Sequence, residues 1–236
     1  MAIDLIQEIK TQFQNAEKGF VFFIKQTVML EETYGFAREN TRFAEGGCCD
    51  EANEAEYQLL ETYWGRRFKF GGLAGYCHGG RTALGAVSHH VPENEGQKNL
   101  LLVAGAHIGY HNGQWGQLPR TGQPGVTTSC GSLAAIVGAG YDTIRNKPDD
   151  ALDRQQRTVE QIILPYLEQC AHAGDTPDIV TATRHLMQQI DADLEKIVAD
   201  LKSGFTGQIA LITGITINTV QGNFFSPTRV EVFGRS

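Results

Sequence analysis

The spacing of apolar residues along the chain separates helical stretches from runs that favour strands. Apolar positions 3, 5, 6, 9 and 13 fall close to one helical face and predict an amphipathic helix over about residues 3–18. Further helices are expected over residues 21–40 and over residues 50–63, whose first turn is acidic, as the helix dipole favours. The glycine-rich segment 65–92 instead predicts turns and short strands.

The middle of the chain is expected to hold a buried strand followed by a helix. KNLLLVAGAHIGYH is a short continuous apolar run, and we expect its strand to end at His107. A loop rich in glycine and proline follows over residues 112–125. The stretch TTSCGSLAAIVGAGY then begins with residues that cap helix N-termini, which predicts a helix with Cys130 in its first turn.

The C-terminal part is expected to hold two long helices and a pair of strands. The helices are predicted over about residues 150–173 and 177–203. In the second, apolar residues step by three or four positions and predict one buried face, formed by Leu186, Ile190, Leu194, Ile197 and Leu201. The tail carries two β-rich runs, QIALITGITINT and FFSPTRVEVF, which predict a hairpin or an edge pair of strands.

Composition narrows the classes of protein to which the chain can belong. Its 236 residues fit one domain spanning residues 1–236, and 41% hydrophobic with 20% charged residues is ordinary for a globular protein. The net charge of −7 comes with no basic stripe, so a nucleic-acid partner is not expected. Charges at Asp4, Glu8 and Lys10 interrupt any export signal, and no apolar run approaches the roughly 20 residues that span a bilayer. We therefore expect a cytoplasmic protein with no membrane partner.

The cysteines, at positions 48, 49, 77, 130 and 170, do not indicate a disulfide framework, because their number is odd and their spacing is uneven. In a reducing compartment they are more often core residues, metal ligands or nucleophiles. Two cysteines and one histidine would satisfy a catalytic zinc site, which keeps its fourth position open to water. Cys48 follows a glycine pair at a helix start, His107 ends the predicted strand, and Cys130 begins a helix, where a thiolate is stabilised.

A carboxylate close to Cys48 favours metal binding over simple burial of a core cysteine. Cys48, Cys49 and Asp50 form a C-x-D string, in which Asp50 could accept a hydrogen bond from water at the metal or take the open position itself. A core cysteine, which belongs to one of the most buried residue types, has no need of such a partner. Cys49 stays open as an alternative ligand to Cys48.

The other cysteines and histidines receive separate interpretations. Cys77 is interpreted as a buried spacer beside His78, because adjacent residues rarely bind one tetrahedral ion together, and Cys170 as a core residue of a helix. His89 and His90 are either hydrogen-bonded or interface histidines or a functional pair. Since the pKa of histidine lies near neutrality, His89 is our candidate for relaying protons.

Five short motifs, CCDEAN, GGLAG, SHHVP, AGAHIGY and TSCGS, occur in this order between about residues 45 and 135. Together they resemble the limiting-CO2-inducible protein B family, whose members are similar to β-type carbonic anhydrases and to the theta class. The resemblance implies an α/β fold with a β-carbonic-anhydrase-like sheet flanked by helices, to which the long C-terminal helices and the terminal β pair are added. It also implies a homodimer with the site near the subunit interface. The implied zinc ligands are Cys48, His107 and Cys130, with Asp50 as the carboxylate of an Asp-Arg pair.

Two features depart from an ordinary β-carbonic anhydrase. Its C-x-D-x-R motif lacks the arginine here, because the string EANE follows Asp50. We expect Arg81 to supply the missing partner, with Arg66 and Arg67 as rivals, and each of the three is otherwise a solvated arginine. The step from the histidine to the second cysteine ligand is also far longer than in ordinary β enzymes, although it suits the limiting-CO2-inducible family.

The leading hypothesis is zinc-dependent, reversible hydration of CO2 to bicarbonate. Zinc would lower the pKa of its water for attack on CO2, Asp50 would orient that water, and the arginine would keep Asp50 ionised. A similar small molecule, such as carbonyl sulfide or carbon disulfide, stays open as substrate. Two other functions use the same residues: a hydrolase or transferase with Cys130 as nucleophile and His107 as base, and a catalytically silent zinc-binding subunit of a carbon-concentrating assembly.

Overall fold

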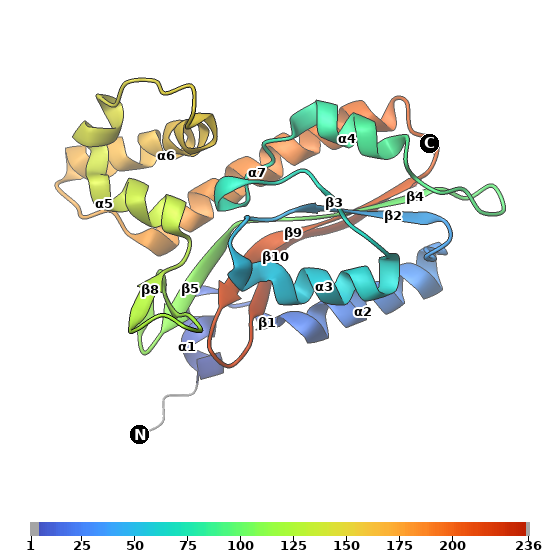
Figure 1. Cartoon of the computed structure of the whole chain (residues 1–236), viewed down its shortest axis with the longest axis horizontal. Helices are drawn as coiled ribbons and strands as arrows, with labels where there is room; N and C mark the ends of the chain where they lie inside the picture. The colour runs from blue at the N-terminus through green and yellow to red at the C-terminus, as the bar shows by residue number, and fades with distance from the viewer. Residues whose placement is uncertain (1–4, 235–236) are drawn as a thin grey trace.

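A mixed β-sheet runs through the centre of the computed structural model, which describes residues 5–234 (Figure 1). Its strand order is β1-β10-β9-β4-β2-β3. The inner strands β2, β4 and β9 are parallel, and β10 returns antiparallel to β9. The strands span β1 Glu17–Lys18, β2 Thr41–Gly46, β3 Phe68–Lys69, β4 Asn99–Ala104, β9 Gln208–Asn218 and β10 Phe224–Phe233.

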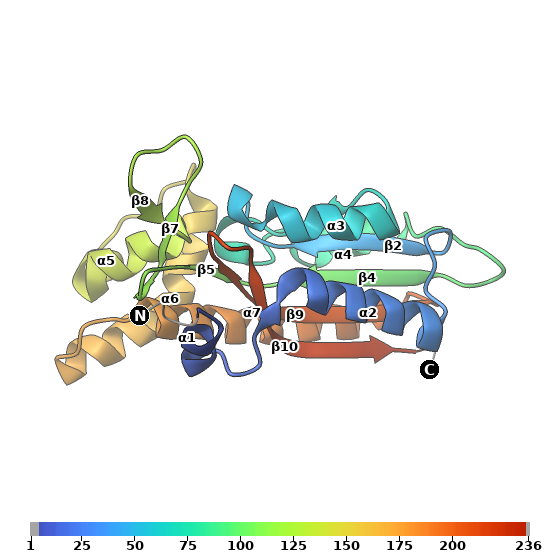
Figure 2. The same ribbon diagram turned by 90° about the horizontal axis from the view of Figure 1, so that it is seen from below.

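Helices cover both faces of this sheet, which confirms the α/β fold (Figure 1, Figure 2). α2 and α3 lie on one face, and α4 and α7 lie on the other. α5 and α6 pack against each other and against α7, beyond the end of α4. The helices span α1 Leu5–Gln12, α2 Gly19–Tyr34, α3 Glu54–Trp64, α4 Gly80–Ser88, α5 Gly131–Arg145, α6 Arg154–Ala173 and α7 Ile179–Lys202, with short 3-10 turns η1 Glu51–Asn53 and η2 Leu73–Gly75.

The position of β4 between two helical layers explains its continuous apolar sequence. Leu100 and Leu102 pack into the core cluster that α4 and α7 share. Leu101 and Val103 point to the opposite face and pack with residues of α2 and α3. Because successive side chains of a strand point to opposite faces, a strand covered on both faces needs apolar residues at almost every position.

The run over residues 98–111 forms two strands instead of the one that was predicted. β4 ends at Ala104, and β5 (His107–His111) begins after a break at Gly105, along the same edge of β9. A Cβ atom at Gly105 would overlap the carbonyl oxygen of Gly214, so the close approach of the two backbones requires glycine. His107 therefore begins a strand and does not end one. The apolar run concealed the break because only a glycine and an alanine separate the two strands.

Segment 65–92 contains helix α4, which corrects the prediction of turns and short strands alone. Gly80 begins this helix with a positive φ, and Gly85 lies in its interior, where a glycine lowers helix stability by about 1 kcal/mol relative to alanine. Leu84 and Val87 are fully buried in the cluster shared with α7, so tertiary packing overrides the weak helix propensity.

The predicted loop over residues 112–125 also differs from the prediction, because it holds two short strands, β6 Gln114–Trp115 and β7 Gln117–Pro119. β7 pairs with β8 Val126–Thr128.

The other predicted elements are confirmed with small changes in their bounds. The first helix, predicted over residues 3–18, spans Leu5–Gln12, and the end of the predicted range forms β1 beside β10 instead. Residues 3 and 4 of the prediction lie outside the described residues. α2 stops at Tyr34 because Gly35 takes the left-handed conformation that ends helices. The face of α7 predicted to be buried is buried at Leu186, Ile190, Leu194 and Ile197. The terminal hairpin exists as β9 and β10, but β9 is an inner strand of the sheet and not an edge strand.

None of the described helices combines the length and apolar character needed to cross a bilayer.

Candidate metal centre

Cys48, His107 and Cys130 come together at one end of the sheet. One ligand atom from each residue lies within 4.8 Å of those of the other two, and all three side chains are buried. Cys48 follows the end of β2 by two residues, His107 begins β5, and Cys130 is the N-cap of α5. Cys48 and His107 each follow the carboxyl end of a parallel strand, β2 and β4, at the same edge of the sheet. Cys130 reaches this place because Gly109 of β5 donates a backbone hydrogen bond to the carbonyl oxygen of the preceding residue, Ser129.

The imidazole of His107 is oriented toward the two cysteines. Its Nδ1 atom lies 2.8 Å from Asn218 Oδ1, and an amide oxygen can only accept a hydrogen bond. Nδ1 therefore carries the proton, and Nε2 keeps its lone pair. Nε2 is buried and has no hydrogen-bond partner among the described residues. A buried imidazole nitrogen without a partner is costly unless a ligand such as a metal ion takes its lone pair.

The two thiols differ in their pKa although they are neighbours. The pKa of Cys48 is raised to about 12, first by its hydrogen bond to Cys130 and then by burial. The pKa of Cys130 is lowered, first by the hydrogen bond from Cys48, and also by the backbone N–H groups of Leu133 and Ser132 at the start of α5. Of the two thiols, Cys130 is therefore the one that ionises more readily.

This donor set fits zinc. Two thiolates and one imidazole are ligands that Zn²⁺ prefers, and a cation would remove the cost of ionising both buried thiols. Among residues 5–234, the cluster includes no fourth cysteine or histidine. The site therefore resembles a three-ligand, open zinc site more than a closed structural one.

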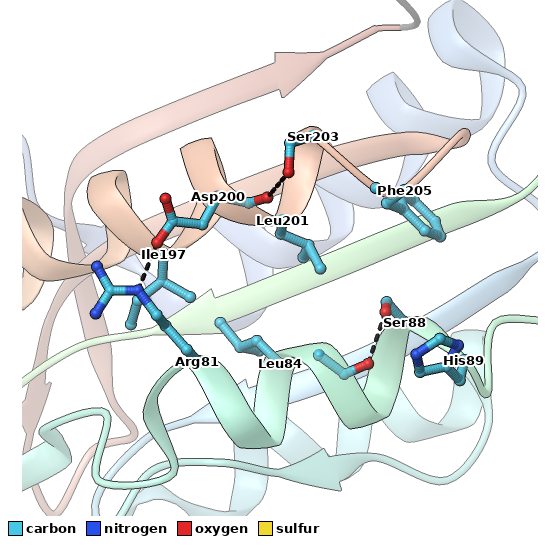
Figure 3. A pocket seen from close by; sticks show the side chains of 11 residues that line it. Arg81, Leu84, Ser88, His89, Ile197, Asp200, Leu201, Ser203 and Phe205 are labelled. Carbon is cyan, nitrogen blue, oxygen red and sulfur yellow. Dashed lines mark hydrogen bonds and ion pairs between the residues drawn. The ribbon is translucent and has the colours of Figure 1, made fainter.

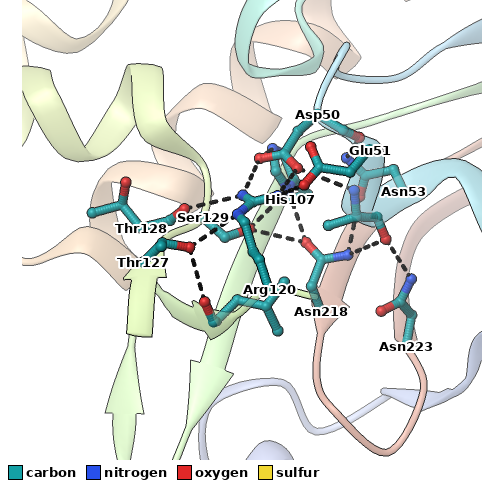
Figure 4. A network of polar contacts seen from close by, with 12 residues as sticks. Asp50, Glu51, Asn53, His107, Arg120, Thr127, Thr128, Ser129, Asn218 and Asn223 are labelled. Atoms are coloured by element: carbon teal, nitrogen blue, oxygen red, sulfur yellow. Dashed lines mark hydrogen bonds and ion pairs between the residues drawn. The ribbon is translucent and has the colours of Figure 1, made fainter. Parts of the chain in front are cut away.

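Asp50 lies beside this cluster and forms a two-pronged ion pair with Arg120 (Figure 4). Arg120 Nη1 and Nη2 donate to Asp50 Oδ1 and Oδ2, each over 2.8 Å. Asp50 Oδ2 lies 4.0 Å from His107 Nε2, so the carboxylate borders the three ligand atoms. Burial acts to raise the pKa of Asp50, but the hydrogen bonds from Arg120 and from the backbone N–H of Ala52 outweigh it, and the pKa is lowered. Asp50 is therefore ionised at neutral pH.

Several further contacts hold the guanidinium of Arg120 in place. Its Nε donates to Thr127 Oγ1 over 2.9 Å, and its Nη2 donates to the carbonyl oxygen of Thr128 over 3.1 Å. Glu51 is a second, exposed carboxylate that pairs with Nη1. Arg120 follows β7 in the hairpin that leads through β8 to Cys130. The arginine is thus carried by the same hairpin that positions a ligand.

Arg120 replaces Arg81 as the partner of Asp50, which corrects our prediction. Arg120 lies neither near Asp50 in the sequence nor in the glycine-rich segment, but in a stretch predicted to be a loop. Its approach to Asp50 is a tertiary contact across 70 positions of the chain. The only local signal was that a charged residue lay in the segment leading to Cys130.

Arg81 and its rival Arg67 pair with other carboxylates. Arg81 is exposed and pairs with Asp200 on α7 (Figure 3). The side chain of Arg67 is buried, and its Nε lies 2.7 Å from Glu45 Oε2. The other rival, Arg66, is not a partner either, because the arginine that pairs with Asp50 in the described part of the chain is Arg120.

His89 and His90 lie at the far end of the sheet, which corrects the proposed proton relay. They follow α4, and His89 lines a pocket between α4 and the end of α7, together with Arg81 (Figure 3). Arg42, near the start of β2, donates from Nε to the carbonyl oxygen of His90 over 3.2 Å. Gly46, the last residue of β2, lies four residues further along the strand, which at about 3.3 Å per residue is roughly 13 Å, and Cys48 follows beyond this end. His89 is therefore too distant to exchange protons directly with the cluster.

The remaining cysteines lie outside the cluster. Cys49 is exposed and is not part of the group of ligand atoms. Cys77 and Cys170 are both buried in the larger hydrophobic core, as expected for a spacer and a helix core residue. His78 is half-buried, and burial lowers its pKa.

The chain is similar to proteins of known structure. A solved structure of PtLCIB4, described as a homolog of the limiting CO2-inducible protein LCIB, is 29% identical, with a TM-score of 0.85 over 97% of this chain and 95% of that one. The structure of limiting CO2-inducible protein LCIB is 20% identical, with a TM-score of 0.71 over 95% of this chain and 93% of that one, which is a likeness of fold. No curated protein matched the chain. Residues 19–234 match the family described as limiting CO2-inducible proteins B/C beta carbonic anhydrases, and the chain belongs to that family.

Proposed function

We propose that this chain binds one zinc ion through Cys48, His107 and Cys130 and reversibly hydrates CO2 to bicarbonate. The observation that carries the proposal is the buried convergence of two thiols and an imidazole nitrogen that has no hydrogen-bond partner among residues 5–234. A zinc ion held by three such ligands would supply a water molecule activated for attack at neutral pH. Family membership supports CO2 as the substrate.

Asp50 and Arg120 would orient the reaction. Since both oxygens of Asp50 receive hydrogen bonds from Arg120, the carboxylate is held ionised and is not free to swing toward the cluster as a further ligand. Asp50 Oδ2 would accept a hydrogen bond from the attacking water and direct a lone pair of that water toward CO2. Arg120 acts through Asp50 and is a positioning residue.

The two alternative functions have less support. A cysteine nucleophile must reach its substrate, and Cys130 is only 2% exposed and is hydrogen-bonded to Cys48. A silent structural zinc site would be closed by a fourth ligand, and the nearest candidate, Asp50, is engaged by Arg120. The homodimer with the site near its interface, the cytoplasmic location and the single domain over residues 1–236 stay predictions.

Elemental analysis of protein purified without added metal, paired with stopped-flow CO2 hydration on the same sample, tests the proposal. We expect about one zinc per chain and hydration that disappears in C130A together with the metal. An Asp50→Ala variant should keep its zinc and lose most of its hydration activity. Zinc without hydration in the unmodified chain would refute the enzymatic function, and absence of metal would refute the zinc site.

A further inference from the structure

The amide of Asn218 occupies a central place behind the metal centre. Asn218 is the last residue of β9 and is fully buried. Its Oδ1 contacts His107 Nδ1 at 2.8 Å, and its Nδ2 donates to the carbonyl oxygen of Ala52 over 3.0 Å and to Asn53 Oδ1 over 3.2 Å (Figure 4). The amide therefore bridges the imidazole and the η1 turn that follows Asp50.

The surrounding groups determine which end of the Asn218 amide faces His107. Two oxygens, those of Ala52 and Asn53, accept from the NH2 group. The Ser129 hydroxyl, which is also fully buried, donates to the Oδ1 end over 3.3 Å and lies 3.4 Å from His107 Nδ1. A flipped amide would set its oxygen against two acceptors in a buried space, which is strongly unfavourable.

The same contacts connect His107 to the segment that carries Asp50. Asn53 Nδ2 donates to the carbonyl oxygen of Asp50 over 3.3 Å, while Asn53 Oδ1 accepts from Asn218. Asn223, in the turn after β9, donates to the carbonyl oxygen of Ala52 over 2.9 Å. The β9–β10 turn thus holds the Asp50 segment and the imidazole in one hydrogen-bonded unit.

We propose that Asn218 is a positioning residue for the metal centre: it holds His107 in the tautomer with the proton on Nδ1 and aims the Nε2 lone pair at the two thiols. The inference rests on the zinc-binding part of the proposed function and does not depend on the substrate. Partners behind a metal-bound histidine typically change metal affinity by about 10- to 100-fold when they are removed.

The variant that tests this role is Asn218→Leu, which keeps the approximate size of the side chain and removes its hydrogen bonds. Asn99→Leu is the matched control, because Asn99 is also a fully buried asparagine of the same sheet. Asn99 begins β4 at the opposite end, where it donates to Asn40 Oδ1 over 2.9 Å. Zinc affinity is measured on folded protein by competition with a chromophoric chelator. We expect N218L to bind zinc about 10- to 100-fold more weakly and N99L to stay within about twofold of the unmodified chain.

A second measurement needs no variant and decides the question even if N218L does not fold. In metal-free protein with ¹⁵N-labelled histidine, at a pH at which the imidazole is neutral, NMR should show the His107 proton on Nδ1, because without zinc only the contacts behind the ring select the tautomer. A proton on Nε2, an unchanged zinc affinity in N218L, or an equal loss of affinity in N99L would each overturn the inference. Zinc-loaded protein that does not hydrate CO2 would refute the proposed function and leave the role of Asn218 standing.

Discussion

Asp50 and Arg120 form an ion pair that is largely shielded from water, with side chains 12% and 13% exposed. Arg120 contributes a planar fork that matches both carboxylate oxygens, a geometry that a lysine would not reproduce. The pair keeps a charged carboxylate beside a cluster that would hold a cation. At this scale, the proposed function depends on a contact between residues far apart in the chain.

Arg120→Gln should therefore lower CO2 hydration at least about tenfold while leaving zinc content unchanged, because Asp50 loses the group that keeps it ionised and oriented. Stopped-flow rates and elemental analysis on the same samples measure both quantities. Arg81→Gln is the matched control, since Arg81 is exposed and pairs with Asp200, away from the cluster. Equal rates in R120Q and the unmodified chain would refute the role of Arg120.

Cys48 and Cys49 are adjacent, but only Cys48 belongs to the cluster. Cys48→Ser should lose nearly all bound zinc, whereas Cys49→Ser should retain about one ion per chain, because Cys49 is exposed. Elemental analysis after dialysis distinguishes the two variants. Retention of zinc in C48S together with its loss in C49S would show that Cys49 is the ligand.

Arg67 has a structural role that a pH series can measure. Its hydrogen bond lowers the pKa of Glu54, so this pair stabilises the fold above the ordinary glutamate pKa of about 4.3, and the stabilisation is lost as pH falls through the lowered pKa. Arg67→Gln also leaves the buried carboxylate of Glu45 without its cation. We expect R67Q to lower the free energy of unfolding by about 3 kcal/mol at pH 7 and by much less near pH 3.

Urea denaturation of metal-free protein at a series of pH values measures this difference. Lys69→Gln serves as the control, because Lys69 is exposed and lies 3.5 Å from Glu54, so its loss should cost less than about 1 kcal/mol. A cost of R67Q that stays constant from pH 7 to pH 3 would contradict the assignment to these carboxylates.

At the scale of elements, the break between β4 and β5 places His107 at the start of a strand. Gly105→Ala should lower the free energy of unfolding by about 1–3 kcal/mol, because the Cβ atom of the new alanine would overlap the carbonyl oxygen of Gly214. Gly85→Ala, in the interior of α4 with open space around it, should instead raise stability by about 0.5–1 kcal/mol. Urea midpoints compare the two, and a neutral G105A would show that the backbones can separate.

Local patterns predicted most elements. A helix buried on one face has apolar residues every three or four positions, and a strand buried on both faces has a continuous apolar run. The buried face of α7 shows the first pattern, and β4 shows the second. Local patterns missed α4, because its glycines are typical of turns. This helix is stabilised by packing on α7. They also merged β4 with β5, because the residues that separate the two strands have no polar character.

At the scale of the whole molecule, the metal centre joins segments from widely separated parts of the chain. A ligand that binds only the folded state stabilises it by RT ln(1 + [L]/Kd), about 4 kcal/mol when the free ligand reaches 1,000 Kd. Removal of zinc by a chelator should therefore lower the thermal midpoint by several degrees. C130A should show no such shift, because it lacks one of the three ligands. Identical midpoints with and without chelator in the unmodified chain would contradict zinc binding at this site.

The sequence by itself determined the α/β class, the long helices, the terminal hairpin and the candidate ligands Cys48, His107 and Cys130, since each leaves a local pattern or motif. Only the tertiary structure decided that Arg120 pairs with Asp50, that Arg81 and His89 lie away from the cluster, and that Asn218 orients His107. Periodicity records which residues are buried, because burial repeats with the geometry of a helix or strand. Pairing between distant polar residues has no period, and it is set by how the strands and turns meet at one end of the sheet.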